Sequence, residues 1–273
     1  MLLAAVDADF TGSVPEHYER DLGPVIFGGY AADLARRVAA HYPERVLEIA
    51  AGTGLVTRRL RGLLPEGAHL TATDVNPPML DVARTKFRPG DQVMFQLADA
   101  CALPFPDGAF DAVVCQFGVM FFPDKAQSYR EVHRVLAPGG RYLFNVWDSH
   151  KYNPFGRITH KLVQRLFPSD TPSFYRVPFG YHEIDPIKEA LIEARLADLT
   201  VSVVRQEAEV PSLAAFARGL VYGNPLAKQI RARGDVDPDR VIDALIEALR
   251  GEVGADPGRT PLQAIVFDTG KHR

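Results

Sequence analysis

Short apolar runs alternate with longer amphipathic segments through the first half of the chain. The run at 46–50 is almost entirely apolar and ends in glycines, which is typical of a buried strand. Similar runs predict strands at 70–73, 93–97, 110–116 and 142–147, and the segments between them predict helices at 55–64, 77–86 and 124–136. Strands that alternate with helices of about 10 to 15 residues indicate βαβ units and a doubly wound, mostly parallel α/β sheet.

The second half of the chain is less regular. Residues 148–184 are rich in aromatic, histidine and proline residues and have no clean period. Further along, the patterns predict a helix at 184–194, a strand at 199–204, helical structure over 212–250 and a last strand at 262–268. We interpret 148–184 and 211–257 as insertions on one seven-stranded sheet, in preference to a separate helical domain.

Composition narrows the class of protein. The chain has 273 residues, 47% hydrophobic and 24% charged, with 31 basic against 34 acidic residues and a formal net charge of −3. This near-neutral charge argues against a nucleic-acid partner, which would be held mainly by phosphate neutralisation. No window approaches the roughly 20 apolar residues of a membrane span. Cys101 and Cys115 cannot build a disulfide framework or a four-thiolate metal site, so we expect a reducing, cytoplasmic setting and no metal.

Polar and glycine residues at four predicted strand ends suit a nucleoside ligand. Gly52 and Gly54 open a helix, where glycine lets a ligand approach the free backbone N–H groups. Asp74 ends the second strand, where a carboxylate can accept hydrogen bonds from both ribose hydroxyls. Asp99 follows the third strand, and Gln116 ends the fourth at the carboxyl edge of the sheet. Each residue alone also fits an ordinary turn, but together they favour a nucleoside site.

Longer stretches around these residues resemble one family. Residues 46–54 (Val-Leu-Glu-Ile-Ala-Ala-Gly-Thr-Gly) look like motif I of class I S-adenosylmethionine-dependent methyltransferases. Residues 72–80 resemble its acidic loop, and 134–141 the turn before its fifth strand. The most specific stretch, 98–111, is similar to small-molecule methyltransferases of the ubiquinone/menaquinone-biosynthesis type. The resemblance is strong over 44–147, weak in the N-terminal segment and last two strands, and slight in the insertions.

The resemblance implies a Rossmann-like methyltransferase fold, S-adenosyl-L-methionine as cofactor and S-adenosyl-L-homocysteine as product. It implies that the methionine part lies against Glu48, Ala50, Gly52 and Gly54, the ribose on Asp74, the adenine among Val75, Met79, Asp99 and Ala100, and the sulfonium near Gln116. Glu48 departs from the family's frequent aspartate. The segment before the first strand would cover the cofactor with Tyr18, Phe27 and Tyr30, which fit simple helix packing equally well.

The expected organisation is a single methyltransferase domain over 1–273. Its parts are a helical cover at 1–43, a cofactor-binding core at 44–147, last strands at 198–210 and 258–270, and insertions at 148–184 and 211–257 that cap the acceptor site. A group of large apolar residues between the fourth strand and residue 180 predicts an apolar acceptor pocket: Met120, Phe121, Phe122, Trp147, Phe155, Phe174, Tyr175 and Phe179. The acceptor is therefore expected to be a small apolar or aromatic molecule.

The catalytic residues are unknown from the sequence alone. Methyl transfer to a weakly acidic acceptor needs a general base, for which His150, Tyr152, Tyr181 and His182 are candidates because they lie in or beside the irregular insertion. His160 and Tyr222 are weaker candidates. Each of these residues is also compatible with a surface or packing role. The methylated atom and the oligomeric state, including a homodimer, stay open.

Rival functions make different demands on the sequence. A nicotinamide-dependent dehydrogenase needs a third glycine in its fingerprint, where this chain has Thr57. The stretch Asn-Pro-Pro-Met at 76–79 superficially resembles a motif of amino-methylating DNA enzymes, but it follows the second strand and not the fourth. A protein that binds the cofactor without catalysis is compatible with the sequence.

Overall fold

The sheet of this computed structural model has the strand order β3-β2-β1-β4-β5-β7-β6. Residues 8–234 and 236–272 are described; residues 1–7 of the predicted cover, with 235 and 273, lie outside them. Strand β7 runs in the opposite direction to the other six strands, so its pairings with β5 and β6 are antiparallel and the other pairings are parallel. The predicted seven-stranded, mostly parallel fold is therefore confirmed. The strands are β1 (Arg45–Glu48), β2 (His69–Asp74), β3 (Val93–Leu97), β4 (Phe110–Gln116), β5 (Leu136–Trp147), β6 (Leu196–Val210) and β7 (Gly258–Lys271).

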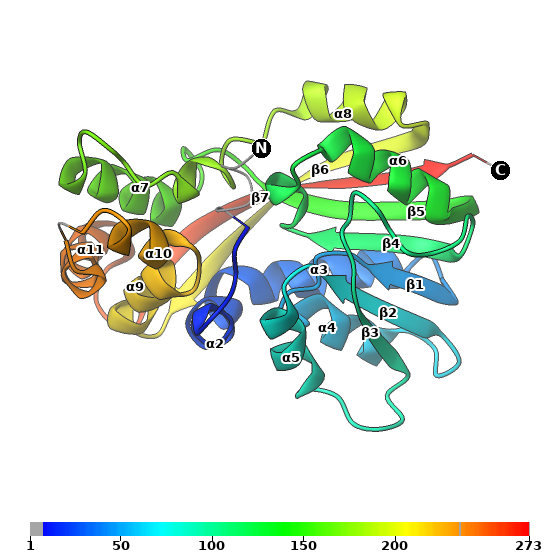
Figure 1. Ribbon diagram of the computed structural model, residues 1–273, viewed down its shortest axis with the longest axis horizontal. Helices are drawn as coiled ribbons and strands as arrows, with labels where there is room; N and C mark the ends of the chain where they lie inside the picture. The colour runs from blue at the N-terminus through cyan, green and yellow to red at the C-terminus, as the bar shows by residue number, and fades with distance from the viewer. Residues whose placement is uncertain (1–7, 235, 273) are drawn as a thin grey trace.

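Helices cover both faces of the sheet because the buried strands are apolar on both sides. Helices α3 (Gly28–Ala39) and α4 (Leu55–Leu63) pack on the face that includes Val46. Helices α6 (Lys125–Val135) and α8 (Ile184–Glu193) pack on the opposite face, which includes Leu47 (Figure 1). Strand order reverses between β1 and β4, the position where doubly wound sheets bind ligands at their carboxyl ends.

Local sequence signals explain where several helices begin. The Asp124 carboxylate accepts a hydrogen bond from the Gln127 N–H over 2.8 Å and caps α6. Helix α5 (Pro77–Arg84) starts with a proline, whose missing N–H costs nothing in the first turn. Gly54 caps α4 with φ of +80°, a conformation that favours glycine.

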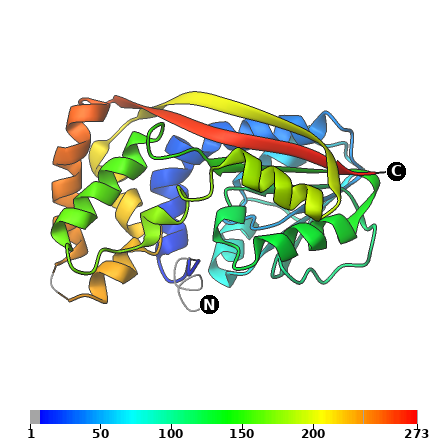
Figure 2. The ribbon, with the colours of Figure 1, turned by 90° about the horizontal axis from the view of Figure 1, so that it is seen from above.

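Strands β6 and β7 extend beyond the patterns at 199–204 and 262–268, close to the expected bounds 198–210 and 258–270, and they carry a separate group of helices. Their pairing continues from the sheet to Val210 opposite Gly258. The helices at this end are α7 (Pro154–Leu166), α9 (Leu213–Tyr222), α10 (Leu226–Arg231) and α11 (Pro238–Val253), with the short η3 (Phe174–Arg176). We call them the helical lobe; it lies beside the sheet in both views (Figures 1 and 2). The two predicted insertions, far apart in sequence, thus pack together there.

One expectation about the second half is wrong. Residues 154–166, predicted as part of an irregular segment, form the regular helix α7. Its buried face, which includes Phe155, Leu162 and Val163, has helical spacing, but Thr159 interrupts the apolar pattern. Thr159 is tolerated there because its hydroxyl donates to the Phe155 carbonyl over 2.7 Å.

The N-terminal segment lies between the sheet and the helical lobe. It forms α2 (Val14–His17) and the π-helix η1 (Tyr18–Phe27), which contacts α3, α9 and β6. The short η2 (Val119–Phe121) follows β4 at the same edge of the sheet. Within the described residues, no helix is both long enough and apolar enough to cross a bilayer.

Candidate functional site

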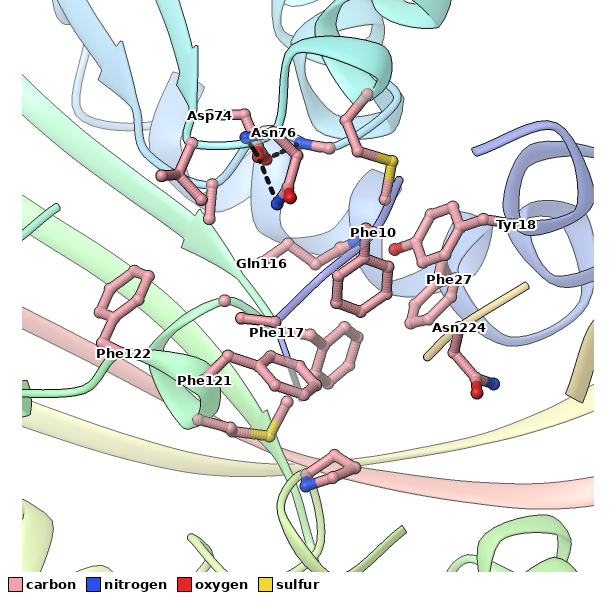
Figure 3. Close-up of a pocket in the computed structure, with 18 of the residues that line it drawn as sticks. Phe10, Tyr18, Phe27, Asp74, Asn76, Gln116, Phe117, Phe121, Phe122 and Asn224 are labelled. Carbon is pink, nitrogen blue, oxygen red and sulfur yellow. Dashed lines mark hydrogen bonds between the residues drawn. The ribbon is translucent and has the colours of Figure 1, made fainter. Parts of the chain in front are cut away.

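A cavity of about 620 Å³ lies between the carboxyl edge of the sheet and the helical lobe (Figure 3). Its walls come from the N-terminal segment, from the loops after β1 to β4, and from residues of η3 and α9. Most of the residues predicted for the cofactor line it: Tyr18, Phe27, Ala50, Gly52, Asp74, Val75, Met79, Asp99, Ala100 and Gln116. We call the part around Asp74 and Asp99 the polar end.

Asp74 anchors the polar end. One carboxylate oxygen accepts the Gly52 N–H at 2.8 Å, and the other accepts the Asn76 N–H at 2.8 Å and the Asn76 Nδ2 at 3.2 Å (Figure 3). Burial raises the pKa of Asp74, and these hydrogen bonds act against that rise. A carboxylate offers about four acceptor positions, so about one remains. The sequence predicts that Asp74 accepts hydrogen bonds from both ribose hydroxyls. For that, the side-chain amide of Asn76 must release its bond to the carboxylate.

A second, much smaller cavity adjoins the polar end and holds Glu48. Tyr18, Ala50, Gly52 and Gln116 line both cavities. The Glu48 side chain is 1% exposed, accepts the Thr57 hydroxyl at 2.6 Å and forms no ion pair with any residue that the structure describes. Burial raises the pKa of Glu48 to about 8. A buried carboxyl without a cation is prepared to receive a cationic ligand group.

Thr53 adds a second unsatisfied group to the small cavity. Its buried hydroxyl has no hydrogen-bond partner among the described residues. A buried polar atom left in this state costs about 1–3 kcal/mol, which a polar ligand recovers. Glu48 and Thr53 can both take part in hydrogen bonds with a polar ligand group.

Two neighbouring strand ends hold strained backbone beside the cavity. Ala50 follows β1 and Phe117 follows β4, and both have φ of +52°, which is unfavourable for residues with a side chain. Gly118, which follows Phe117, lies so close to Ala50 that a Cβ on it would be 2.5 Å from the Ala50 Cβ. Strain of this kind is typical of binding sites held by the surrounding structure.

Two predicted cofactor residues lie outside both cavities. The Tyr30 ring is buried against Phe117 and Trp147, and its hydroxyl donates to the Val204 carbonyl at 3.2 Å. It therefore stands behind the cavity wall. Gly54 caps helix α4, and it packs so close to α5 that a Cβ on it would lie 3.0 Å from the Ala83 Cβ.

Aromatic rings form the other end of the cavity, which we call the aromatic end. The Phe121 and Phe174 rings stack with centroids 5.9 Å apart, and Phe10 meets both rings edge-on. Phe117 stacks on Trp147 with centroids 4.0 Å apart. All the residues predicted for an apolar pocket line this one cavity: Met120, Phe121, Phe122, Trp147, Phe155, Phe174, Tyr175 and Phe179.

Polar groups at the aromatic end are already paired within the protein. The Tyr175 hydroxyl donates to the Leu220 carbonyl at 2.8 Å. The Asn224 Nδ2 donates to the same carbonyl at 2.9 Å, and its Oδ1 accepts the Leu226 N–H at 2.9 Å. This end therefore suits a flat, largely apolar molecule.

The predicted general bases do not reach the cavity. Tyr181 shares a hydrogen bond of 2.9 Å with the Tyr129 hydroxyl, and Tyr152 lies at the surface. The His150 ring is tilted against that of Phe179, with centroids 4.6 Å apart, and His150 does not line the cavity. Burial, then His160, lowers the pKa of His150 to about 4. The buried His182 Nδ1 has no hydrogen-bond partner among the described residues, and His182 does not line the cavity.

Sequence reasoning missed several residues of the cavity wall. Phe10, Asn76, Phe117 and Asn224 all line it (Figure 3). Asn76 and Phe117 adjoin predicted site residues and could have been found at the strand ends. Phe10 and Asn224 come from distant segments without a motif. Across residues 8–234 and 236–272, no group of His, Cys, Asp and Glu could hold a metal ion.

The chain is similar to known methyltransferases. A family profile described as "Methyltransferase domain" matches residues 47–144. The demethylmenaquinone methyltransferase of Thermus thermophilus is 43% identical over 139 residues, which are 50% of this chain and 61% of that protein. That of Deinococcus radiodurans is 34% identical over 167 residues, 60% of this chain and 69% of that protein. The chain thus spans about two thirds or less of the length of the curated relatives it matches.

Among solved structures, the phosphoethanolamine N-methyltransferase 2 of Haemonchus contortus in complex with S-adenosyl-L-methionine is similar, with a TM-score of 0.62. The two are 17% identical, and the match covers 98% of this chain and 59% of that chain. At this identity the likeness shows the fold alone.

Proposed function

Because the chain belongs to the class I S-adenosylmethionine-dependent methyltransferases, we propose that it transfers a methyl group to a small, flat and largely apolar acceptor. The observation that carries the proposal is one cavity with a polar end and an aromatic end. Polar groups at one end suit a nucleoside, and rings at the other suit an apolar molecule. The two ligands would then meet inside a single cavity.

The unsatisfied groups of the two cavities fit S-adenosylmethionine. Glu48 and Thr53 would hold its amino-acid part, because they offer a carboxyl without a cation and an unpaired hydroxyl. Asp74 would hold the ribose, with Met79 and Asp99 along the adenosine. When bound, the cofactor supplies a methyl group that is already activated on a sulfonium.

The protein's own contribution is to position the acceptor and exclude water. Such positioning can account for about 7–11 kcal/mol of a reaction barrier. Tyr18 lines both cavities, and burial raises its pKa, so its hydroxyl stays a hydrogen-bond donor. The predicted bases His150, Tyr152, Tyr181 and His182 stand outside the cavity. We therefore infer an acceptor that needs little help from a histidine base.

The acceptor is proposed from the names of the relatives and from the aromatic end of the cavity. The curated relatives are named demethylmenaquinone methyltransferases, which favours a quinol-type ring as the first acceptor to test. However, the matched profile ends at residue 144, and several residues of the aromatic end, among them Trp147, Phe155 and Phe174, lie beyond it. A panel should therefore include other phenols and aromatic amines.

The experiment that tests the proposal is calorimetric titration with S-adenosylmethionine and S-adenosylhomocysteine, followed by turnover on the panel. We expect micromolar binding that falls at least about tenfold in D74A, since charged hydrogen bonds are worth about 1.5–3 kcal/mol. Asp81→Ala, at an exposed residue of α5, is the matched control. Binding of NADH in place of these ligands would contradict the proposal. Binding without turnover would favour a non-catalytic cofactor-binding protein.

Other expectations about the protein's setting remain proposals. The net charge of −3 favours a small-molecule acceptor over nucleic acid. Both cysteines are free, which is compatible with a cytoplasmic location. A homodimer stays a possibility to be tested by light scattering, and the division into cover, core and insertions can be tested by limited proteolysis.

A further inference from the structure

Gln116 stands at the junction of the two cavities. It is the last residue of β4, at the carboxyl edge of the sheet, and it lines both the large cavity and the small one. In Figure 3 its side chain is drawn between the Asp74–Asn76 pair and the rings of Phe117 and Phe121. The position therefore faces the place where a cofactor and an acceptor would meet.

The Gln116 amide oxygen is buried and has no hydrogen-bond partner among the described residues. Other buried side-chain atoms share this condition, but of the residues that carry them only Gln116 lines the large cavity: the rest are Glu19, Thr53, Tyr142, Asn145, His150, His160 and His182. A buried hydrogen-bond acceptor without a partner is unfavourable, and a ligand in the cavity could supply the missing hydrogen-bond donor.

The neighbouring polar groups cannot take over this task. Tyr175 and Asn224 are occupied by the Leu220 carbonyl and the Leu226 N–H, as described above. The amino-acid part of the cofactor has its own unsatisfied partners, Glu48 and Thr53, in the small cavity. Among the polar residues named here, Gln116 alone combines an unsatisfied acceptor atom with a place on the wall of the large cavity.

We propose that Gln116 is a positioning residue for the acceptor: its amide oxygen accepts a hydrogen bond from a donor on an otherwise apolar ring and so orients the ring toward the cofactor. This inference rests on the proposed methyl transfer and adds a residue that selects the acceptor. A ring of the same shape without a donor would leave the amide oxygen buried and unpaired, and it should therefore bind more weakly.

The test compares two probes of nearly the same shape, 2-naphthol and 2-methoxynaphthalene, on protein saturated with S-adenosylhomocysteine. We expect the wild type to bind 2-naphthol about tenfold more tightly. In Q116L this preference should fall to about twofold or less, while the dissociation constant for S-adenosylhomocysteine changes by less than about twofold. Gln96→Leu, on strand β3 outside the cavity, is the control and should keep the preference.

Two results would overturn the inference. One is a wild type that binds both probes equally or binds neither. The other is Q116L that keeps its preference between the probes, because Gln116 would then not orient the acceptor. If this variant also loses affinity for S-adenosylhomocysteine, Gln116 serves the cofactor. If Q116L does not fold, Q116M keeps the side-chain length without the amide oxygen, and the same loss of preference is expected of it. Failure of the wild type to bind S-adenosylhomocysteine would count separately, against the proposed function.

Discussion

Asp21 on the π-helix η1 and Arg218 on helix α9 form an ion pair that ties the N-terminal segment to the helical lobe. The Arg218 Nε lies 3.2 Å from the Asp21 carboxylate, whose side chain is 2% exposed. Arg20 and His17 also contact this carboxylate, at 2.8 and 3.2 Å. Because η1 carries Tyr18 and the Asp21 carboxylate joins η1 to the lobe, the pair helps to hold one wall of the cavity.

Asp21→Asn should therefore lower stability and loosen the cavity. Removing one partner of a buried ion pair costs about 3–5 kcal/mol when the other charges stay buried; here Arg20 and Arg218 can reach water, so we expect about 1–3 kcal/mol. Urea unfolding measures this loss. The control is D81N, which breaks an exposed pair on α5 and should change stability by less than about 1 kcal/mol. Equal effects of the two variants would contradict the structural role of Asp21.

Asp21 also predicts how stability responds to acid. Burial alone would raise the pKa of this carboxyl, but the hydrogen bonds from Arg20, Arg218 and His17 lower it to about 2. A lowered folded-state pKa stabilises the protein above the unfolded value of 3.8, and this contribution is lost as pH falls toward 2. Unfolding curves between pH 2 and 5 should show a steeper loss in the wild type than in D21N.

Glu48 predicts the opposite dependence at higher pH. Its pKa is about 8 in the folded protein against 4.5 in the reference state, so the folded form keeps a proton that the unfolded chain releases. Stability should therefore fall as pH rises from about 4.5 to 8, by at most about 1.4 kcal/mol per pH unit. Glu48→Gln removes this slope, which urea unfolding between pH 5 and 8 would reveal as a difference from the wild type. A slope unchanged in the variant would contradict the prediction. Glu189→Gln, on the exposed side of α8, is the control.

Gly118→Ala should damage the junction of β1 and β4. The new Cβ would lie 2.5 Å from the Ala50 Cβ and 2.8 Å from the Cys115 Sγ, so the strand ends must move apart. We expect a loss of about 1–3 kcal/mol in unfolding free energy and weaker binding of S-adenosylmethionine. Gly62→Ala on α4, where nothing lies within 4 Å, should leave stability equal or higher. Normal cofactor binding in G118A would show that the close approach is unimportant.

Phe174→Leu should affect the acceptor and spare the cofactor. The substitution removes the ring that stacks on Phe121 while keeping most of the apolar volume. An aromatic pair adds about 0.5–1.5 kcal/mol beyond burial, so the KM for an aromatic acceptor should rise about two- to tenfold. Calorimetry should give an unchanged dissociation constant for S-adenosylmethionine. Phe87→Leu, beside β3 and outside the cavity, is the control.

The polar end of the cavity could be predicted from the sequence because its residues lie next to strand ends. Strand β4 is a largely apolar, mostly buried run, and parallel strands bring their carboxyl ends to one edge of the sheet, so the positions of Asp74 and Gln116 follow from the pattern. The exceptions were side chains whose direction depends on packing. Tyr30 shares a helix face with buried residues, and only the structure shows that its hydroxyl turns to Val204.

For the aromatic end, the sequence predicted an apolar pocket but not the direction of each side chain. A concentration of aromatic residues after β4 indicated an apolar pocket, and these residues do line it. The general bases were chosen because they lie near this stretch in sequence, which does not determine which way a side chain points. Tyr181 faces Tyr129, and Phe10 reaches the cavity from a segment more than 100 residues away from Phe121. Such contacts depend on tertiary packing, which local periodicity does not encode.

The paired ends of β6 and β7 have a mechanical consequence. From Arg205 opposite Gln263 to Val210 opposite Gly258, strands β6 and β7 continue beyond their neighbour β5 as a two-stranded ribbon that leads into the helical lobe. A two-stranded ribbon twists easily but resists stretching, because its hydrogen bonds fix the register. Together with the Asp21–Arg218 ion pair, the ribbon therefore fixes how far the lobe stands from the sheet. Substitutions along this ribbon, far from any ligand, would thus tune the width of the cavity and the size of the molecules that enter it.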